Sequence, residues 1–141
     1  MNGAVRHFAL PFLAAGLTCA AASGVLADPA LPAGPALPSG MEAALLEGFV
    51  EIQPDGERWA RFRYIMPALS EGAGYDSVQQ DFAVLCGEAA LPMLDAAAEQ
   101  VSVVVVSLMD KPLEFGQSDP ETIQFFEVFA IRDDRCIWED Y

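Results

Sequence analysis

The feature that most constrains the fold is an apolar run near the middle of the chain, Val101–Met109, with the sequence VSVVVVSLM. A strand that is apolar on successive residues, and not only on alternate ones, is covered on both faces and lies at the centre of a sheet. Pro112 has no amide proton to donate to a neighbouring strand and biases Lys111 towards extended or turn geometry, so we expect this strand to end at Asp110. Polar residues directly after a central strand are a common position for a functional site.

The first 27 residues have the pattern of a secretory signal peptide. Arg6 precedes an apolar stretch without acidic residues, and Val25-Leu26-Ala27 resembles a signal-peptidase site. We expect cleavage after Ala27. The alternative is a lipoprotein with its lipid attached at Cys19. The apolar stretch is shorter than the ~20 residues that a membrane span needs, so we expect no stable span after cleavage. The chain is therefore expected to be periplasmic or secreted.

Removal of this segment would leave 114 residues (141 − 27), enough for one modest core. We expect a Pro/Ala-rich linker over residues 28–46, with one or two helical turns at 41–47, and a single domain over 47–141. All 21 acidic residues stay and one of the seven basic residues leaves, so the net charge becomes −15 (6 − 21). Such a surface repels nucleic acid and anionic lipid.

Two cysteines remain in the expected mature chain, Cys86 and Cys136. A pair of cysteines in an exported domain indicates one disulfide. It would close a loop of 50 residues (136 − 86). In the chain-entropy treatment this constraint is worth about 4 kcal/mol.

Hydrophobic periodicity and turn signals predict the remaining elements. They are a β-hairpin of residues 48–53 and 58–66 around a Pro-Asp-Gly-Glu turn, a helix of about 14 residues after a capping box at Asp76–Gln79, a short helix at 93–99 restarted by Pro92, and strands at 122–131 and 135–139. The order ββαβββ predicts an α+β, two-layer sandwich with a mostly antiparallel sheet and one main helix.

Two groups of charged residues are positioned for binding or for ion pairing. Arg61 and Arg63 share one face of the strand 58–66, as an anion-binding pair or as the solvated side of the sheet. Glu127 shares its predicted strand face with Ile123, Phe125, Phe129 and Ile131. Because a buried carboxylate must be paired or protonated, we expect Glu127 to form a salt bridge with one of the two arginines.

Several chemistries are excluded by composition. His7 is the only histidine and lies in the expected signal peptide, so the mature domain lacks histidine triads, dyads and histidine metal sites. No metal site, cofactor or catalytic residue is predicted. The polar residues that remain follow the central strand and are Asp110, Lys111, Glu114, Asp119 and Glu121. Asp110 and Glu114 at about 5–9 Å would suit a glycosidase, and the same oxygens would suit a weak calcium site. The alternative is that these residues form turns and solvated surface. We expect Lys111 to form a salt bridge with Asp110 or Glu114.

Several separated motifs along most of the chain match, in the same order, those of a known protein family. They are Cys86, Ala90-Leu91-Pro92, the run Ser107–Gly116 (SLMDKPLEFG), Asp119-Pro120-Glu121, Gln124–Glu127 (QFFE) and Cys136–Glu139 (CIWE). Over about residues 48–141 the chain resembles a family of small exported alphaproteobacterial proteins of unknown function. The resemblance implies no activity; an acetolactate synthase label carried by some relatives does not suit a chain several-fold too short and without a thiamine-diphosphate motif.

Two hypotheses for function follow. The first is a non-enzymatic periplasmic domain that binds a protein partner or serves in the envelope. The second is a small ligand-binding protein or hydrolase that uses the acidic loop Asp110–Glu121. The candidate binding residues are Asp110, Lys111, Glu114, Arg61 and Arg63. A deep pocket that joins them would favour the second hypothesis, and a shallow surface with exposed aromatic residues would favour the first.

Overall fold

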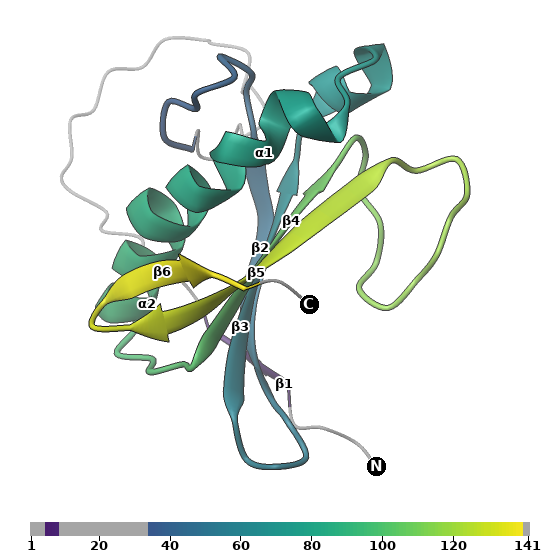
Figure 1. The fold of residues 1–141 in the computed structure, drawn as a ribbon. Helices are drawn as coiled ribbons and strands as arrows, with labels where there is room; N and C mark the ends of the chain where they lie inside the picture. Colours follow the sequence, from purple (N-terminus) through teal and green to yellow (C-terminus); the bar gives the residue numbers. More distant parts are fainter. Residues whose placement is uncertain (1–4, 9–33, 140–141) are drawn as a thin grey trace, which may run out of the picture.

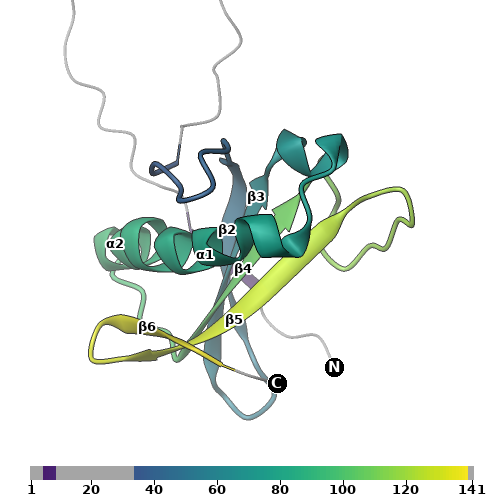
Figure 2. The ribbon, with the colours of Figure 1, turned by 45° about the horizontal axis from the view of Figure 1, so that its top comes forward.

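The computed structural model describes residues 5–8 and 34–139, which form one six-stranded sheet with a helical layer on one face (Figures 1 and 2). In chain order the elements are β1 (Val5–His7), β2 (Ala44–Ile52), β3 (Arg58–Ile65), the 3-10 helix η1 (Pro67–Glu71), α1 (Tyr75–Val84), the π-helix η2 (Leu85–Ala90), α2 (Leu91–Ala96), β4 (Val103–Met109), β5 (Gln124–Arg132) and β6 (Arg135–Trp138). The strands lie in the sheet in the order of the chain. The predicted α+β class is confirmed. The predicted order ββαβββ is incomplete, because β1 precedes it and the helix has three parts.

β4 is the central strand of the domain, as the apolar run predicts. It lies between β3 and β5, and all seven of its residues are buried. The β3–β4 pair is parallel and the other pairs are antiparallel. The parallel pair follows from the helical connection, because a chain that crosses the sheet through a helix returns in the same direction.

The β2–β3 hairpin closes at the predicted turn. Gly56 has φ 89°, and the amide of Gln53 donates a hydrogen bond of 2.8 Å to the carbonyl of Glu57. β2 nevertheless starts at Ala44, which pairs with Ile65, so the helical turns expected at 41–47 are wrong. Pairing with β3 outweighs the weak helical preference of this segment.

Residues 34–43, expected to be part of a linker, pack against the domain instead. The side chain of Leu37 is only 8% exposed and belongs to the core. Both the amide and the hydroxyl of Ser39 donate hydrogen bonds to the buried carboxylate of Asp81 on α1. The folded unit therefore begins before residue 47. Residues 28–33 of the expected linker, the cleavage site at Ala27 and the lipoprotein position Cys19 lie outside the described residues.

The helical layer is one continuous rod of α1, η2 and α2. Both junctions, at Val84 and Leu91, have α-helical dihedral angles. Pro92 has no amide proton and its ring crowds the preceding turn, and the amide of Leu91 donates to the carbonyl of Cys86 in a wider π-type turn. Pro92 thus widens the rod and does not break it. The predicted capping box is absent, because α1 starts at Tyr75 without a side-chain cap.

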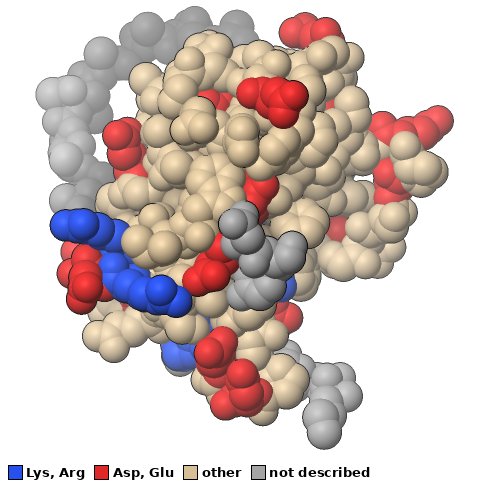
Figure 3. Space-filling model, viewed as in Figure 1, with Lys and Arg blue, Asp and Glu red and all other residues tan. Residues whose placement is uncertain are grey.

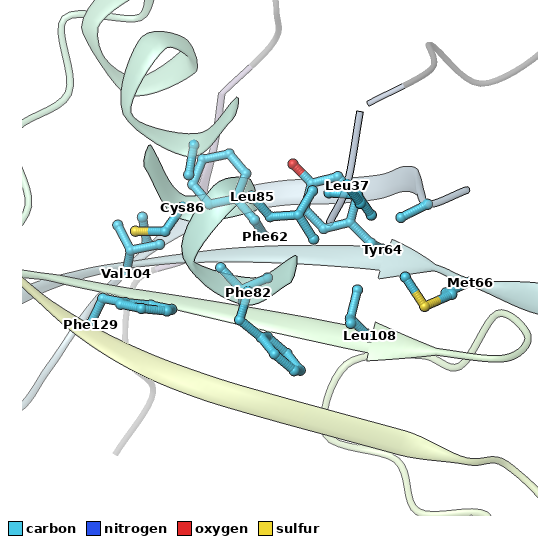
Figure 4. Close-up of a cluster of buried hydrophobic side chains, with 14 of the residues drawn as sticks. Leu37, Phe62, Tyr64, Met66, Phe82, Leu85, Cys86, Val104, Leu108 and Phe129 are labelled. Atoms are coloured by element: carbon cyan, nitrogen blue, oxygen red, sulfur yellow. The ribbon is translucent and has the colours of Figure 1, made fainter. Parts of the chain in front are cut away.

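The core lies between the rod and the sheet (Figure 4). Phe82 and Leu85 from the rod meet Phe62 from β3 and Val104 from β4. Tyr64 also lies in this core, and among the described residues its hydroxyl has no hydrogen-bond partner. Burial raises the pKa of Tyr64 well above its usual value.

The predicted disulfide is confirmed and joins the two layers. Cys86 on η2 is bonded to Cys136 on β6, with 6.2 Å between their Cα atoms. β6 is short and closes a tight hairpin with β5 through Asp133 and Asp134, which both have positive φ. The disulfide therefore holds an edge of the sheet against the middle of the rod.

We expect the Cys86→Ser, Cys136→Ser double variant to be about 4 kcal/mol less stable than the oxidised protein, because the unfolded chain regains the freedom of a 50-residue loop. Urea denaturation of both proteins measures this difference. Wild-type protein treated with a reductant is the matched control and should follow the variant. A loss below about 1 kcal/mol in both would show that the covalent constraint contributes little.

Candidate functional site

The face of the sheet opposite the rod carries an arginine layer on β3. Alternation along β3 places Arg61 and Arg63 on this face and Phe62 on the core face. The Nε of Arg61 lies 2.8 Å from a carboxylate oxygen of Glu51, and Arg63 pairs with Glu47. Both acidic partners belong to β2 of the same hairpin. The two arginines are therefore neutralised within the domain and are not a free anion-binding pair.

Arg63 also fixes the loop between β4 and β5, residues 110–123. Its side chain is 3% exposed, and its guanidinium donates a hydrogen bond to the carbonyl of Leu113 as well as pairing with Glu47. A buried guanidinium is stable only when its donors are satisfied. The loop supplies one acceptor and β2 supplies the other, so Arg63 joins the loop to the sheet.

Phe115 covers the arginine layer from the same loop. Its ring packs edge-on against Phe49 at 4.9 Å between centroids. The guanidinium carbons of Arg61 and Arg63 lie 5.1 Å and 5.7 Å from the centroid of the Phe115 ring. These distances are within the range of cation–π attraction. Phe115 thus covers this face while 43% of its own surface stays exposed.

The acidic residues of the loop mainly shape its backbone. Asp110 accepts a hydrogen bond of 3.0 Å from the amide of Ile123, at the far end of the loop. Asp119 accepts hydrogen bonds from the amide of Glu121 and the hydroxyl of Thr122, and these bonds lower the pKa of Asp119. Turn formation therefore explains their positions.

Lys111 is exposed and its partner differs from the predicted one. Its Nζ lies 3.8 Å from the carboxylate of Asp119, not beside Asp110 or Glu114. The loop closes on itself through this contact, so that Asp119 comes near the start of the segment. An exposed pair at this distance contributes little stability.

One small pocket brings two of the predicted site residues together. It has a volume of about 290 Å³ and is lined by Leu46, Glu47, Arg63, Pro112, Leu113 and Glu114. Small-molecule sites usually span about 300–1,000 Å³. The space suits one side chain or a small ion. Asp110, Lys111 and Arg61 do not line this pocket.

Exposed apolar side chains share this face with the arginine layer. Phe126 is 62% exposed and pairs in register with Ser107 of β4, the neighbour of Arg63 in the same row. Ile137 on β6 is also exposed and pairs with Ala130 of β5. We call Phe115, Phe126 and Ile137 the aromatic face. In the described part of the chain no helix covers it (Figure 2).

Phe126 was missed by the sequence analysis, which followed only the core face of its strand. The alternate positions 126, 128 and 130 of β5 are Phe, Val and Ala, so both faces of this strand are apolar. That pattern was a usable signal for a second covered or exposed apolar surface.

Glu127 lies on the core side of β5 and not beside the arginines, so the predicted salt bridge with Arg61 or Arg63 is wrong. Its carboxylate accepts hydrogen bonds from the hydroxyl of Tyr75 on α1 and from Nε1 of Trp138 on β6, the latter at 2.9 Å. The arginines point to the opposite face of the sheet. The carboxylate is thus satisfied by two neutral donors, as a half-buried acid requires.

Two larger hollows lie elsewhere on the domain. One of about 760 Å³ is beside α2 and the β5–β6 turn and is lined by Asp95, Glu99, Asp133 and Asp134 among others. One of about 670 Å³ lies between residues 34–44 and the end of β3. Within the described ranges, no group of three or more His, Cys, Asp or Glu side chains is arranged to hold a metal ion.

Charge is unevenly distributed on the surface. On the side shown in Figure 3, acidic side chains are spread widely, whereas most visible basic side chains gather where the β5–β6 hairpin projects. No helix among the described residues is long and apolar enough to cross a membrane.

A comparison with models of protein families matches residues 14–141 to a family of unknown function (DUF6497). The comparisons with curated proteins and with solved structures give no match. The resemblance to a family of unknown function is thereby confirmed.

The hydrogen bond from Tyr75 to Glu127 generates a pH prediction. It is the largest of the causes that raise the pKa of Tyr75 to about 12. We expect Glu127→Gln to lower this pKa towards the usual value of about 10, since a neutral amide holds the phenol proton less strongly. Ultraviolet difference spectra of the phenolate measure it, and Tyr75→Phe identifies the Tyr75 transition.

The sign of the stability effect follows from the same pKa. A phenol whose folded pKa is raised stabilises the fold fully below the unfolded pKa, and this contribution is lost as pH rises towards about 12. The wild type should therefore lose more stability than Glu127→Gln in this window. An unchanged Tyr75 transition in Glu127→Gln would show that Glu127 does not hold the phenol proton.

Proposed function

The chain belongs to a family of unknown function (DUF6497), and we propose from its structure that it is an exported, non-enzymatic domain that binds a protein partner. The aromatic face is the proposed binding surface, and the neighbouring β4–β5 loop is its rim. The observation that carries this proposal is the exposure of Phe126 and Phe115 on a sheet face that none of the described helices covers.

Export is supported by two independent features. Residues 1–27 have the charge and hydrophobicity pattern of a signal peptide with a cleavage site after Ala27. The Cys86–Cys136 bond is of a kind that persists in oxidising compartments. A periplasmic or secreted location fits both features, and lipid attachment at Cys19 is the alternative route to the envelope.

Exposed aromatic rings support protein binding. Aromatic side chains that are exposed in the free protein are enriched in the cores of protein interfaces. There they become buried and supply much of the binding free energy. Phe115 is already held in place by Phe49 and the two arginines, so little of its conformational freedom remains to be lost on binding. A ring held in this way is a suitable anchor.

The charge balance supports a basic partner. Arg61 and Arg63 are already paired with Glu51 and Glu47, whereas the chain has 21 acidic and seven basic residues. Complementary charges on a partner would speed association and set its orientation. We infer a partner with an apolar patch bordered by Lys or Arg residues.

A small-ligand site at the 290 Å³ pocket is the second candidate. The buried guanidinium of Arg63 and the carboxylate of Glu114 line it, which favours a small polar ligand. Hydrolysis has less support, because Asp110 and Asp119 bond to backbone amides of the loop that holds them. Binding through the aromatic face uses the larger exposed surface.

Site-specific photo-crosslinking in an exporting bacterium tests the proposal. We expect p-benzoyl-phenylalanine at position 126 or 115 to give the same discrete protein adduct, because both rings belong to one surface. The exposed position Gln80 on α1 is the matched control and should not give it. Phe126→Asp should remove the adduct formed from position 115 while the melting temperature stays within a few degrees.

Two controls make the result decisive. The mass of the exported protein should correspond to a chain that starts at Asp28, and an unchanged mass in Cys19→Ser would exclude lipid attachment.

The variants Lys111→Glu and Glu114→Gln test whether the rim of the surface takes part in binding. If positions 126 and 115 give no adduct, or give the same adducts as Gln80, the aromatic face is not a binding surface.

A further inference from the structure

The outer edge of β2 is only partly paired in the described structure. β2 has nine residues, and β1 pairs with three of them, Phe49, Val50 and Glu51. Its sequence, ALLEGFVEI, is mostly apolar and has neither proline nor lysine, the residues that commonly protect an edge strand. An edge of this kind is a template for a further strand.

Residues 5–8 show how a strand fits this edge. The ring of His7 lies 5.4 Å from that of Phe49, and the ring of Phe8 lies 6.0 Å from that of Phe62. The Phe8 ring lies over Gly48, where a Cβ atom would be in ordinary contact with the tip of the ring at 3.4 Å and would crowd only Phe62, at 3.1 Å. The edge thus combines a strand backbone with a slot for one aromatic side chain above Gly48.

This strand belongs to the segment whose removal we propose above. Signal cleavage after Ala27 would take β1 away, and no other strand of the described residues pairs with the outer side of β2. We propose that the β2 edge of the mature domain binds an extended peptide segment of a partner by strand addition, with an aromatic side chain in the Gly48 slot. Residues 5–8 occupy the same site until cleavage. The timing rests on the proposed export, but the binding site itself does not.

Charge favours a peptide over a second copy of this chain. An antiparallel β2–β2 pair centred on Phe49 would place Glu47 opposite Glu51 of the other copy, and like charges directly opposite destabilise a sheet. Each mature chain would also carry a net charge of −15 (6 − 21). The segment observed on the edge, Val-Arg-His-Phe, has a basic residue and no acidic one. We therefore assign the site to a basic, aromatic strand.

Peptide binding by the full chain tests this assignment. The probe is a fluorescein-labelled peptide with the sequence of residues 2–11, NGAVRHFALP. In one chain β1 is disabled by Val5→Asp, His7→Pro and Phe8→Asp, and the unaltered chain is the control. We expect about ten-fold or more tighter binding by the disabled chain, because the tethered β1 no longer competes at high effective concentration.

Altered peptides distinguish strand addition from a non-specific hydrophobic contact. In a strand, alternate amides face the neighbouring strand, so N-methylation at positions 5 and 7 and N-methylation at positions 6 and 8 should differ, with only one of them abolishing binding. Replacing Phe8 of the peptide by Ser should weaken binding about ten-fold through loss of the slot contact.

Three results would overturn the proposal. The first is no peptide binding by the chain with β1 disabled, at an unchanged melting temperature. The second is an equal loss of affinity with both N-methylation patterns. The third is a dimer, seen by light scattering, that does not bind the peptide. The first two reject strand addition and the third assigns the edge to a second copy. If the protein is not cleaved in an exporting cell, the proposed export fails, whereas these binding results stand by themselves.

Discussion

Burial of β4 on both of its faces is the constraint on which the rest of the structure depends. Seven consecutive residues of this strand are buried, so each face of the sheet needs a cover. The helical rod covers one face with the side chains of Phe82 and Leu85. On the other face the described cover consists of the arginine layer of β3 and Phe115 from the β4–β5 loop.

The two covers are held by different interactions. The rod is fixed by the disulfide to β6 and by Asp81, which binds the segment around Ser39. The loop is fixed by Arg63, whose guanidinium needs both Glu47 and the carbonyl of Leu113. Phe115 therefore covers the second face and also belongs to the aromatic face, so that any test of binding there needs a measurement of stability beside it.

The strand and turn predictions succeeded because they depend on local patterns, and the disulfide prediction succeeded because only two cysteines remain in the expected mature chain. An unbroken apolar run indicates a central strand, and Pro-Asp-Gly indicates a turn, whatever the rest of the chain does. The partner of Glu127 could not be predicted in the same way. Alternation separates the two faces of each strand, but only the register between strands shows which faces coincide, and it places Glu127 with Tyr75 and away from Arg61.

The candidate site was predicted in part. The sequence pointed to the loop after β4 with the arginines of the hairpin as neighbours, and the structure places Arg63 against this loop. Turn formation and a binding site were both open for the acidic residues of the loop, because the same residue types form turns and sites, and the structure shows Asp110 and Asp119 bonded to the loop backbone. The role of Phe115 as a cover depends on a long-range contact with Phe49 that no local pattern reveals.

Native-state hydrogen exchange of the β4 amides tests the two-sided cover most directly. If both faces are closed, the amides of Val103–Met109 are the slowest in the protein and exchange only through global unfolding, with the free energy measured by denaturation. Exchange of these amides through a smaller opening, at a free energy below that of the α1 amides, would contradict the account. It would show that the loop and the arginine layer do not close the second face.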